Sequence, residues 1–297
     1  MADLALTSIM AVWGSSFAIL RGLFTGSSAS PLAVLTVRMG LASVLLLLFL
    51  AVTPRGRAQL ASLRGTLLRD GVFCGALLGL GFLLQTEGLS RTTASRSGFL
   101  TGMLVVLVPI LEFLAFRKRP KTPALAGILL AFAGMTALSA PWAGSSRGTL
   151  LGDSLTAGCA LVFAIHIIAL GRVAPRHPLL PLLLLQLATT GVLAAAAGPL
   201  IEPQHLSAAP RLWLAVVYLA LFATLLAFGI QTWAQKVMPA VRVALISSLE
   251  PVFAALWAAL LLGERLSGRE LAGGALIVLG VAVGEAGAAI WKPGVQA

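Results

Sequence analysis

Long apolar runs follow one another along nearly the whole chain, and only short polar connections separate them. Since a helix needs about 20 mostly apolar residues to cross a bilayer, each run predicts one membrane-spanning helix. Ten runs qualify, near residues 4–24, 31–52, 70–89, 94–116, 121–141, 151–171, 179–199, 210–235, 240–263 and 268–290. The pattern predicts an all-α membrane protein with ten transmembrane helices and no soluble domain.

The pattern of residues in the first half of the chain occurs again in the second half. A shift of 146 positions (231 − 85 = 146), made without a gap, places Gln231 on Gln85 and Phe228 on Phe82. Further identities under the same shift are Ala94 and Ala240, Arg96 and Arg242, Gly127 and Gly273, and Gly134 and Gly280. We therefore predict two copies of one unit, residues 1–145 and 146–297, because a repeat of this length defines the architecture of a chain.

Ten spans shared between two copies give five spans to each copy. An odd number forces the second copy to enter the membrane the opposite way up, so the repeat is inverted. Inverted repeats are typical of secondary transporters, in which two related halves enclose a substrate site near the middle of the bilayer.

Composition supports an integral membrane protein and argues against a soluble one. Hydrophobic residues make up 59% of the chain and charged residues 10%, and the mean hydropathy is +0.99. A soluble domain carries about 25% charged residues. The net charge of +11 is spread over the short connections, which indicates a topology signal and no nucleic-acid partner.

The Lys and Arg residues of the connections predict the orientation of the chain. The richer side receives the connections around residues 55–69 and 117–121, and under the ten-span topology it also receives both termini. Lys and Arg accumulate on the cytoplasmic side of membrane proteins. We therefore expect a multi-pass protein of the cell's inner (plasma) membrane, with both termini in the cytoplasm and the lipid bilayer as its surroundings.

Enzyme chemistry finds no support in the sequence. The three histidines, at positions 166, 177 and 205, have no metal-ligand spacing. No Gly-x-x-x-x-Gly-Lys-Ser/Thr phosphate loop and no Gly-x-Ser-x-Gly nucleophile motif occurs. We expect no catalytic residue, no metal, no cofactor and no ATP-driven step.

Polar and aromatic side chains within the predicted spans are the candidates for a substrate cavity. Polar groups inside a membrane usually face the bundle interior or a water-filled cavity. The candidates are Trp13, Phe17, Phe82, Gln85, Ser97, Thr101, Phe163, His166, Phe228, Gln231 and Ser247. Each has a structural alternative: helix packing or a lipid-facing position for the aromatics, interhelical hydrogen bonds for the polar residues. His166 is either a proton site or a neutral, hydrogen-bonded histidine.

Two charged residues and three backbone positions complete the candidates. Arg38 either holds a carboxylate or reaches the outer membrane surface by snorkelling. Glu250 has three interpretations: proton coupling, contact with a substrate amine, or a structural charge. Gly98, Gly102 and Pro251 are candidate hinges, because glycine permits unusual backbone angles and proline removes a helical hydrogen bond.

Several motifs resemble the drug/metabolite transporter superfamily in its EamA-type branch. They are Trp13-Gly14-Ser15-Ser16-Phe17, the run from Glu250-Pro251 to Leu256, and Leu262-Gly263-Glu264-Arg265-Leu266. In the first copy, Phe99-Leu100-Thr101-Gly102 and Phe116-Arg117-Lys118-Arg119-Pro120 resemble the YddG-type aromatic amino-acid exporters. The resemblance implies ten helices in two inverted repeats, cytoplasmic termini and export of small metabolites.

The main functional hypothesis is a secondary, non-ATP exporter of small amphiphilic metabolites that works by alternating access through a central cavity. Aromatic amino acids are the substrates that the resemblance favours. The alternatives are a multidrug or other metabolite exporter of the same superfamily, and a membrane scaffold that transports nothing. The sequence leaves open the exact substrate, coupling to protons or sodium, the resting conformation, and whether the protein is a monomer or a homodimer.

Overall fold

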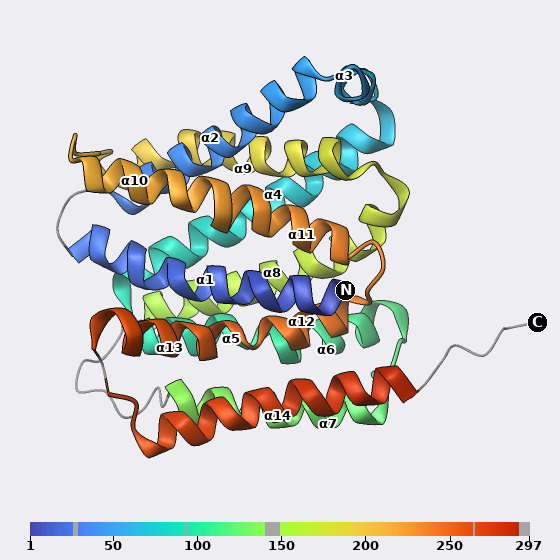
Figure 1. Ribbon diagram of the computed structural model, residues 1–297, viewed down its shortest axis with the longest axis vertical. Coiled ribbons are helices and arrows are strands. Elements are labelled where there is room, and N and C mark those ends of the chain that lie inside the picture. Colours follow the sequence, from blue (N-terminus) through green and yellow to red (C-terminus); the bar gives the residue numbers. More distant parts are fainter. Residues whose placement is uncertain (26–28, 93, 140–148, 264, 291–297) are drawn as a thin grey trace, which may run out of the picture.

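The computed structural model describes residues 1–25, 29–92, 94–139, 149–263 and 265–290, except for the side chains at positions 17, 18, 21, 24, 25, 94, 95, 261, 262 and 287–290. The regular secondary structure of the described part is helical, with one isolated bridge between Ala29 and Leu206. Its elements, labelled in Figure 1, are α1 (Ala2–Thr25), α2 (Pro31–Val52), α3 (Pro54–Leu60), α4 (Gly65–Arg91), α5 (Ala94–Gly102), α6 (Leu104–Phe116), α7 (Thr122–Ser139), α8 (Leu150–Val173), η1 (Ala174–Arg176), α9 (Leu179–Ile201), α10 (Pro210–Tyr218), η2 (Leu219–Leu226), α11 (Ala227–Ala234), α12 (Ala240–Ser247), α13 (Glu250–Leu262) and α14 (Gly268–Ile290).

Eight segments of the described chain are long and apolar enough to cross a membrane as helices. They correspond to eight of the ten predicted spans, namely all except the first and the last. At those two places the structure has α1 and α14, continuous helices of 24 and 23 residues that are not among the eight. The membrane-protein class is confirmed, and the count of ten spans stays a prediction.

Three predicted spans are not continuous α-helices. One is interrupted at Met103, between α5 and α6, and another at Ser248–Leu249, between α12 and α13. The two interruptions match under the shift of 146 positions (103 + 146 = 249). In the third span, η2 is a π-helix between α10 and α11. The sequence predicted a membrane span at each of these places, and all three are among the eight segments that can cross a membrane. The exact positions of the local breaks were not predicted, because apolar periodicity does not report local hydrogen-bond register.

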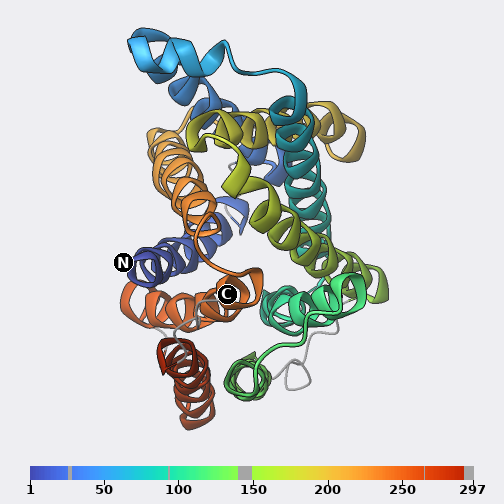
Figure 2. The same cartoon turned by 90° about the vertical axis from the view of Figure 1, so that its right-hand side faces the viewer.

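Helices α7 and α14 run side by side at the end of the bundle farthest from α3 (Figures 1 and 2). Their backbones touch at two pairs of glycines. A β-carbon on Gly127 would lie 2.5 Å from the carbonyl oxygen of Gly280, and one on Gly134 would lie 2.6 Å from that of Gly273. Only glycine permits so close a crossing, which is the usual role of small residues between membrane helices.

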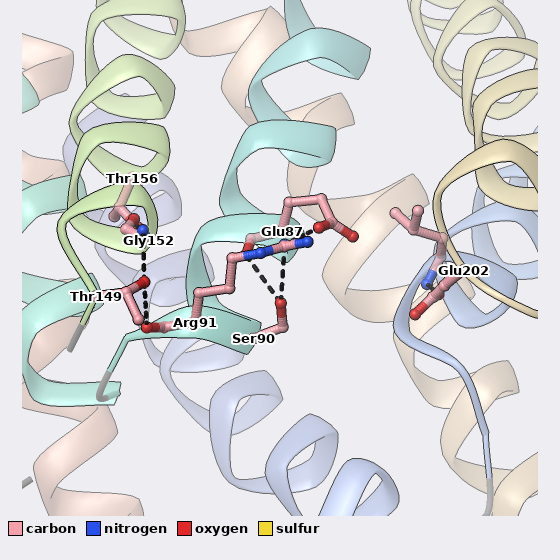
Figure 3. Close-up of polar contacts among 8 residues, drawn as sticks. Glu87, Ser90, Arg91, Thr149, Gly152, Thr156 and Glu202 are labelled. Atoms are coloured by element: carbon pink, nitrogen blue, oxygen red, sulfur yellow. Dashed lines mark hydrogen bonds and ion pairs between the residues drawn. The ribbon is translucent and has the colours of Figure 1, made fainter.

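Hydrogen bonds tie helix ends together where α4 ends and α8 begins (Figure 3). Thr149 caps the first turn of α8 and donates from its hydroxyl to the backbone oxygen of Arg91, at the end of α4 (3.1 Å). The Arg91 guanidinium pairs with Glu87 one turn earlier. On the same side, the Glu202 carboxylate accepts a hydrogen bond from the backbone N–H of Leu32 (2.6 Å). These bonds satisfy groups that a helix terminus leaves unpaired.

The N-terminus, α3 and the end of α14 lie at the same end of the helices (Figure 1). The connections that follow α2, α6 and α8 return at this end too, and they carry the basic residues of positions 55–69, 117–121 and 172–176. The fold thus gathers on one face residues 55–69 and 117–121, from which the sequence predicted a cytoplasmic side, together with residues 172–176.

Candidate functional site

Four aromatic rings from four helices meet in the middle of the bundle. They belong to Trp13 of α1, Phe82 of α4, Phe163 of α8 and Phe228 of α11. Ring centroids lie 5.3 Å apart for Trp13 and Phe228, 5.5 Å for Phe82 and Phe163, and 6.0 Å for Phe82 and Phe228. We call these four residues the aromatic cluster. Separations of this size are typical of favourable ring pairs, each worth about 0.5–1.5 kcal/mol.

The π-helix η2 positions Trp13. The indole Nε1–H of Trp13 donates a hydrogen bond of 2.9 Å to the carbonyl oxygen of Ala223, which lies within η2. A buried indole N–H needs such a partner. Single π-turns inside α-helices occur frequently at functional sites. Here the π-helical segment η2 contains the carbonyl oxygen of Ala223, which accepts the hydrogen bond from Trp13.

Arg38 of α2 lies against the aromatic cluster. Its Cζ atom stands 4.8 Å from the centroid of the Phe82 ring, and the residue is only 7% exposed. In the described part of the chain it forms no ion pair and no hydrogen bond, and its Nε is buried without a partner. Arg38 therefore does not snorkel to the surface but points into the bundle.

The contact with Phe82 does not compensate for burying the charge of Arg38. A desolvated cation over a ring gains about 2 kcal/mol. Removing an unpaired charge from water costs several kcal/mol even after relaxation. The balance leaves a buried guanidinium whose N–H donors are unused among the described residues, and this arrangement favours an anion beside it.

Gln231 lies one turn beyond Phe228 on α11. It is 4% exposed, and its Oε1 atom is buried without a hydrogen-bond donor in the described chain. Its counterpart Gln85 on α4 lies three residues beyond Phe82 and is half-buried. An unpaired amide oxygen inside a protein costs about 1–3 kcal/mol, so a hydrogen-bond donor beside Oε1 of Gln231 would be stabilising.

His166 belongs to a packed hydrogen-bond network and not to the aromatic cluster. Its Nε2 lies 3.1 Å from Oε1 of Gln186 on α9, whose Nε2 donates to Oγ1 of Thr232 on α11 (3.4 Å). All three side chains are buried. This network links three helices and favours the structural interpretation of His166.

The remaining hydroxyl candidates lie in the half-helices around the two interruptions. Ser97 is buried in α5, and Thr101 lies near the end of the same helix with its hydroxyl oxygen buried. Ser247 ends α12 and donates to the backbone oxygen of Val243 (2.9 Å). The side chain of Phe17 lies outside the described residues.

The candidate hinges and Glu250 stand close to the same interruptions. Gly102 ends α5, Pro251 is the second residue of α13, and Gly98 lies in the middle of α5. Glu250 opens α13 and has no ion-pair partner among the described residues. A carboxylate in the first turn of a helix is stabilised by the helix dipole, and the three interpretations of Glu250 stay predictions.

Sequence reasoning missed some partners of these residues. It identified Arg38 and Phe82 separately but gave no sign that one lies over the other. It did not identify Gln186 or the carbonyl of Ala223, since a backbone acceptor carries no residue-type signal. No group of three His, Cys, Asp or Glu side chains in the described chain could hold a metal ion.

Comparisons with known proteins agree with this architecture. The sequence profile of the EamA-like transporter family matches residues 1–140 and 150–283. An uncharacterized transporter of Archaeoglobus fulgidus is 32% identical over 95% of this chain and 85% of its own length. A probable amino-acid metabolite efflux pump of Salmonella typhimurium is 28% identical over 92% of this chain and 91% of its own. A solved crystal structure with 21% identity superposes with a TM-score of 0.79 over 97% of this chain and 98% of that one, which shows the shared fold. The chain therefore belongs to the EamA-like transporter family and is a transporter, not an enzyme.

Proposed function

We propose that this EamA-like transporter exports α-amino acids, aromatic ones among them, from the cytoplasm as a secondary carrier. The substrate binds at the aromatic cluster, and the two halves of the chain expose it alternately to the two sides of the plasma membrane. Residues 1–145 and 146–297 are the two inverted five-helix repeats of this proposal, with both termini in the cytoplasm.

The observation that carries the proposal is the aromatic cluster with Arg38 at its edge. Phe82 and Phe228 are counterparts in the two halves, and their rings meet each other. An apolar, aromatic surface with a few polar groups is typical of small-molecule sites. The relative from Salmonella typhimurium, a probable amino-acid metabolite efflux pump, supports amino acids as the substrate class.

The glycine contacts between α7 and α14 support the two-repeat layout. Under the shift of 146, Gly273 is the counterpart of Gly127 and Gly280 that of Gly134. Gly127 meets Gly280, and Gly134 meets Gly273. Gly127 thus contacts the counterpart of Gly134, and Gly134 contacts the counterpart of Gly127. Such a reciprocal pair of contacts is the signature of a two-fold interface. The family profile also matches two successive stretches of similar length.

Counterpart arginines suggest how the two faces close. Arg96 of α5 pairs with Asp153 at the start of α8, and Arg242 of α12 pairs with Glu285 of α14 and Asp3 of α1. These three ion pairs form two groups at opposite ends of the long helices: that of Arg96 lies at the start of α8, and those of Arg242 include Asp3 at the start of α1. We propose that each one closes its face and opens when the half-helices move about Gly102 and Pro251, a type of rearrangement that discontinuous helices permit.

Efflux from proteoliposomes that contain only this protein tests the proposal. Vesicles are loaded with radiolabelled phenylalanine, and efflux is followed without and then with a pH gradient. Efflux down the amino-acid gradient that ignores pH supports an uncoupled carrier, and efflux only with the gradient indicates proton coupling. If neither condition gives efflux while cationic drugs leave the vesicles, the amino-acid proposal is wrong and the multidrug alternative replaces it.

A further inference from the structure

We propose that Arg38 and Gln231 bind the zwitterionic headgroup of an α-amino acid, with the carboxylate on the guanidinium of Arg38 and the ammonium on Oε1 of Gln231. This inference rests on the proposed function and makes its binding site specific. Both residues are more than nine-tenths buried, and each has a polar atom unpaired in the described chain.

The carboxylate assignment follows from the geometry of Arg38. The ring of Phe82 covers one face of the guanidinium at 4.8 Å. A planar guanidinium donates its N–H groups within its own plane, and a carboxylate accepts two of them in a matching fork. A ring on the face does not occupy the in-plane donors. Since Nε of Arg38 is buried, the two terminal Nη groups are the donors that we assign to the carboxylate, and the cation–π contact can stay in place.

The ammonium assignment follows from the chemistry of the unpaired atom on Gln231. Oε1 is an acceptor, and an ammonium group offers three donors and no acceptor. A neutral acceptor also adds no second charge to the buried region. The zwitterion as a whole is neutral, so its binding supplies an anion to Arg38 without increasing the net charge of the site.

The aromatic cluster connects these two residues. Arg38 lies on Phe82, Phe82 contacts Phe228 at 6.0 Å, and Phe228 precedes Gln231 by three residues on the same helix face. The headgroup and an apolar side chain can therefore be held by adjoining surfaces. The counterpart of Arg38 in the second half is Leu184 (38 + 146 = 184), so the cation occurs on one side only and a single orientation of the ligand is favoured.

Three ligands and three variants test the site on the purified full chain. The ligands are phenylalanine, phenethylamine, which lacks the carboxylate, and 3-phenylpropanoate, which lacks the ammonium. Their dissociation constants come from competition with bound radiolabelled phenylalanine and from thermal stabilisation in detergent. The variants are Arg38→Gln, Gln231→Leu and, as matched control, Arg172→Gln. Arg172 also lies over a ring, that of Phe116, with an unpaired Nε, but in the last turn of α8.

The site predicts a crossed pattern. Arg38→Gln weakens phenylalanine and 3-phenylpropanoate about tenfold or more and leaves phenethylamine unchanged, since a charge-assisted hydrogen bond is lost. Gln231→Leu weakens phenylalanine and phenethylamine and leaves 3-phenylpropanoate unchanged. Arg172→Gln alters none of the three. If Arg38→Gln does not fold, Arg38→Lys keeps the charge without the fork and weakens only the two carboxylate ligands.

The site is overturned if Arg38→Gln or Gln231→Leu changes the dissociation constants of all three ligands in parallel, or changes none of them. It is also overturned if the unaltered protein does not bind phenylalanine. The proposed function fails separately. A protein that binds phenylalanine through Arg38 but moves none across proteoliposomes keeps the site and loses the function. A protein that exports phenylalanine while Arg38→Gln leaves ligand selectivity unaltered keeps the function and loses the site.

Discussion

Replacement of Gly134 by alanine tests whether the contact between α7 and α14 limits how closely they pack. A β-carbon at this position would lie 2.6 Å from the backbone oxygen of Gly273 and 2.7 Å from the backbone nitrogen of Ile277. Ordinary van der Waals contact of a β-carbon begins near 3.4 Å. Because both obstacles are backbone atoms, the helices have to separate by 0.8 Å (3.4 − 2.6) at this point.

The expected cost follows from that separation. A gap of about 0.5–1 Å loses a quarter to a half of the dispersion energy between the atoms involved, and overpacking by one methyl group typically costs about 1–3 kcal/mol. Alanine recovers about 0.5–1 kcal/mol of backbone entropy in a helix. Gly134→Ala should therefore lower the free energy of unfolding by about 0–2.5 kcal/mol, with a mid-range value of about 1 kcal/mol.

Gly40 offers a matched control for Gly134. It also lies inside a long helix, α2, but apart from the neighbouring backbone of α2 itself a β-carbon there would meet nothing in the described chain within 4 Å. Gly40→Ala should raise stability by about 0.5–1 kcal/mol. Unfolding of both variants in mixed micelles at increasing denaturing detergent gives the two values. Changes of the same sign, or a stabilised Gly134→Ala protein, would refute the close backbone crossing.

Three further outcomes are expected. Trp13→Phe keeps the ring but leaves the carbonyl of Ala223 unpaired, so it should cost about 1–2 kcal/mol of stability in an unfolding titration; no loss would contradict the role of the indole bond. Gly102→Ala and Pro251→Ala should each slow efflux at unchanged substrate affinity, and two normal transport rates would remove the hinge proposal. His166→Asn should leave the pH profile of efflux between about pH 6 and 8 unaltered, because its imidazole is held in a buried hydrogen-bond network; an altered profile in a folded variant would restore the proton-site interpretation.

Apolar run lengths predicted the course of the chain well. The bounds of α2 coincide with the predicted span 31–52, and α4, α7, α8 and α9 begin and end within a few residues of the expected positions. The bilayer imposes this regularity, because a backbone in lipid must satisfy its hydrogen bonds within one helix. The short helix α3 was not predicted, since its seven residues lie between two spans.

The contacts between side chains inside the bundle were less predictable than the positions and lengths of the helices. The shift of 146 identified Phe82 and Phe228 as counterparts, but their mutual contact depends on where the helices cross. The winding of η2 and the interruptions at Met103 and Leu249 depend on backbone hydrogen bonds that many sequences permit. Arg38 shows the same limit, because its burial could be decided only by the helices packed around it.

Counterflow in proteoliposomes tests the central claim most directly. Vesicles are preloaded with unlabelled phenylalanine, and a trace of labelled phenylalanine is added outside. A carrier that exposes one site alternately to each side exchanges internal unlabelled phenylalanine for external labelled phenylalanine. The label should therefore accumulate transiently inside, above its external concentration. Vesicles preloaded with a compound that the protein does not bind should show no such accumulation. If label enters only to its equilibrium level, whatever the preload, the protein is not a carrier of phenylalanine and the account of its function is wrong.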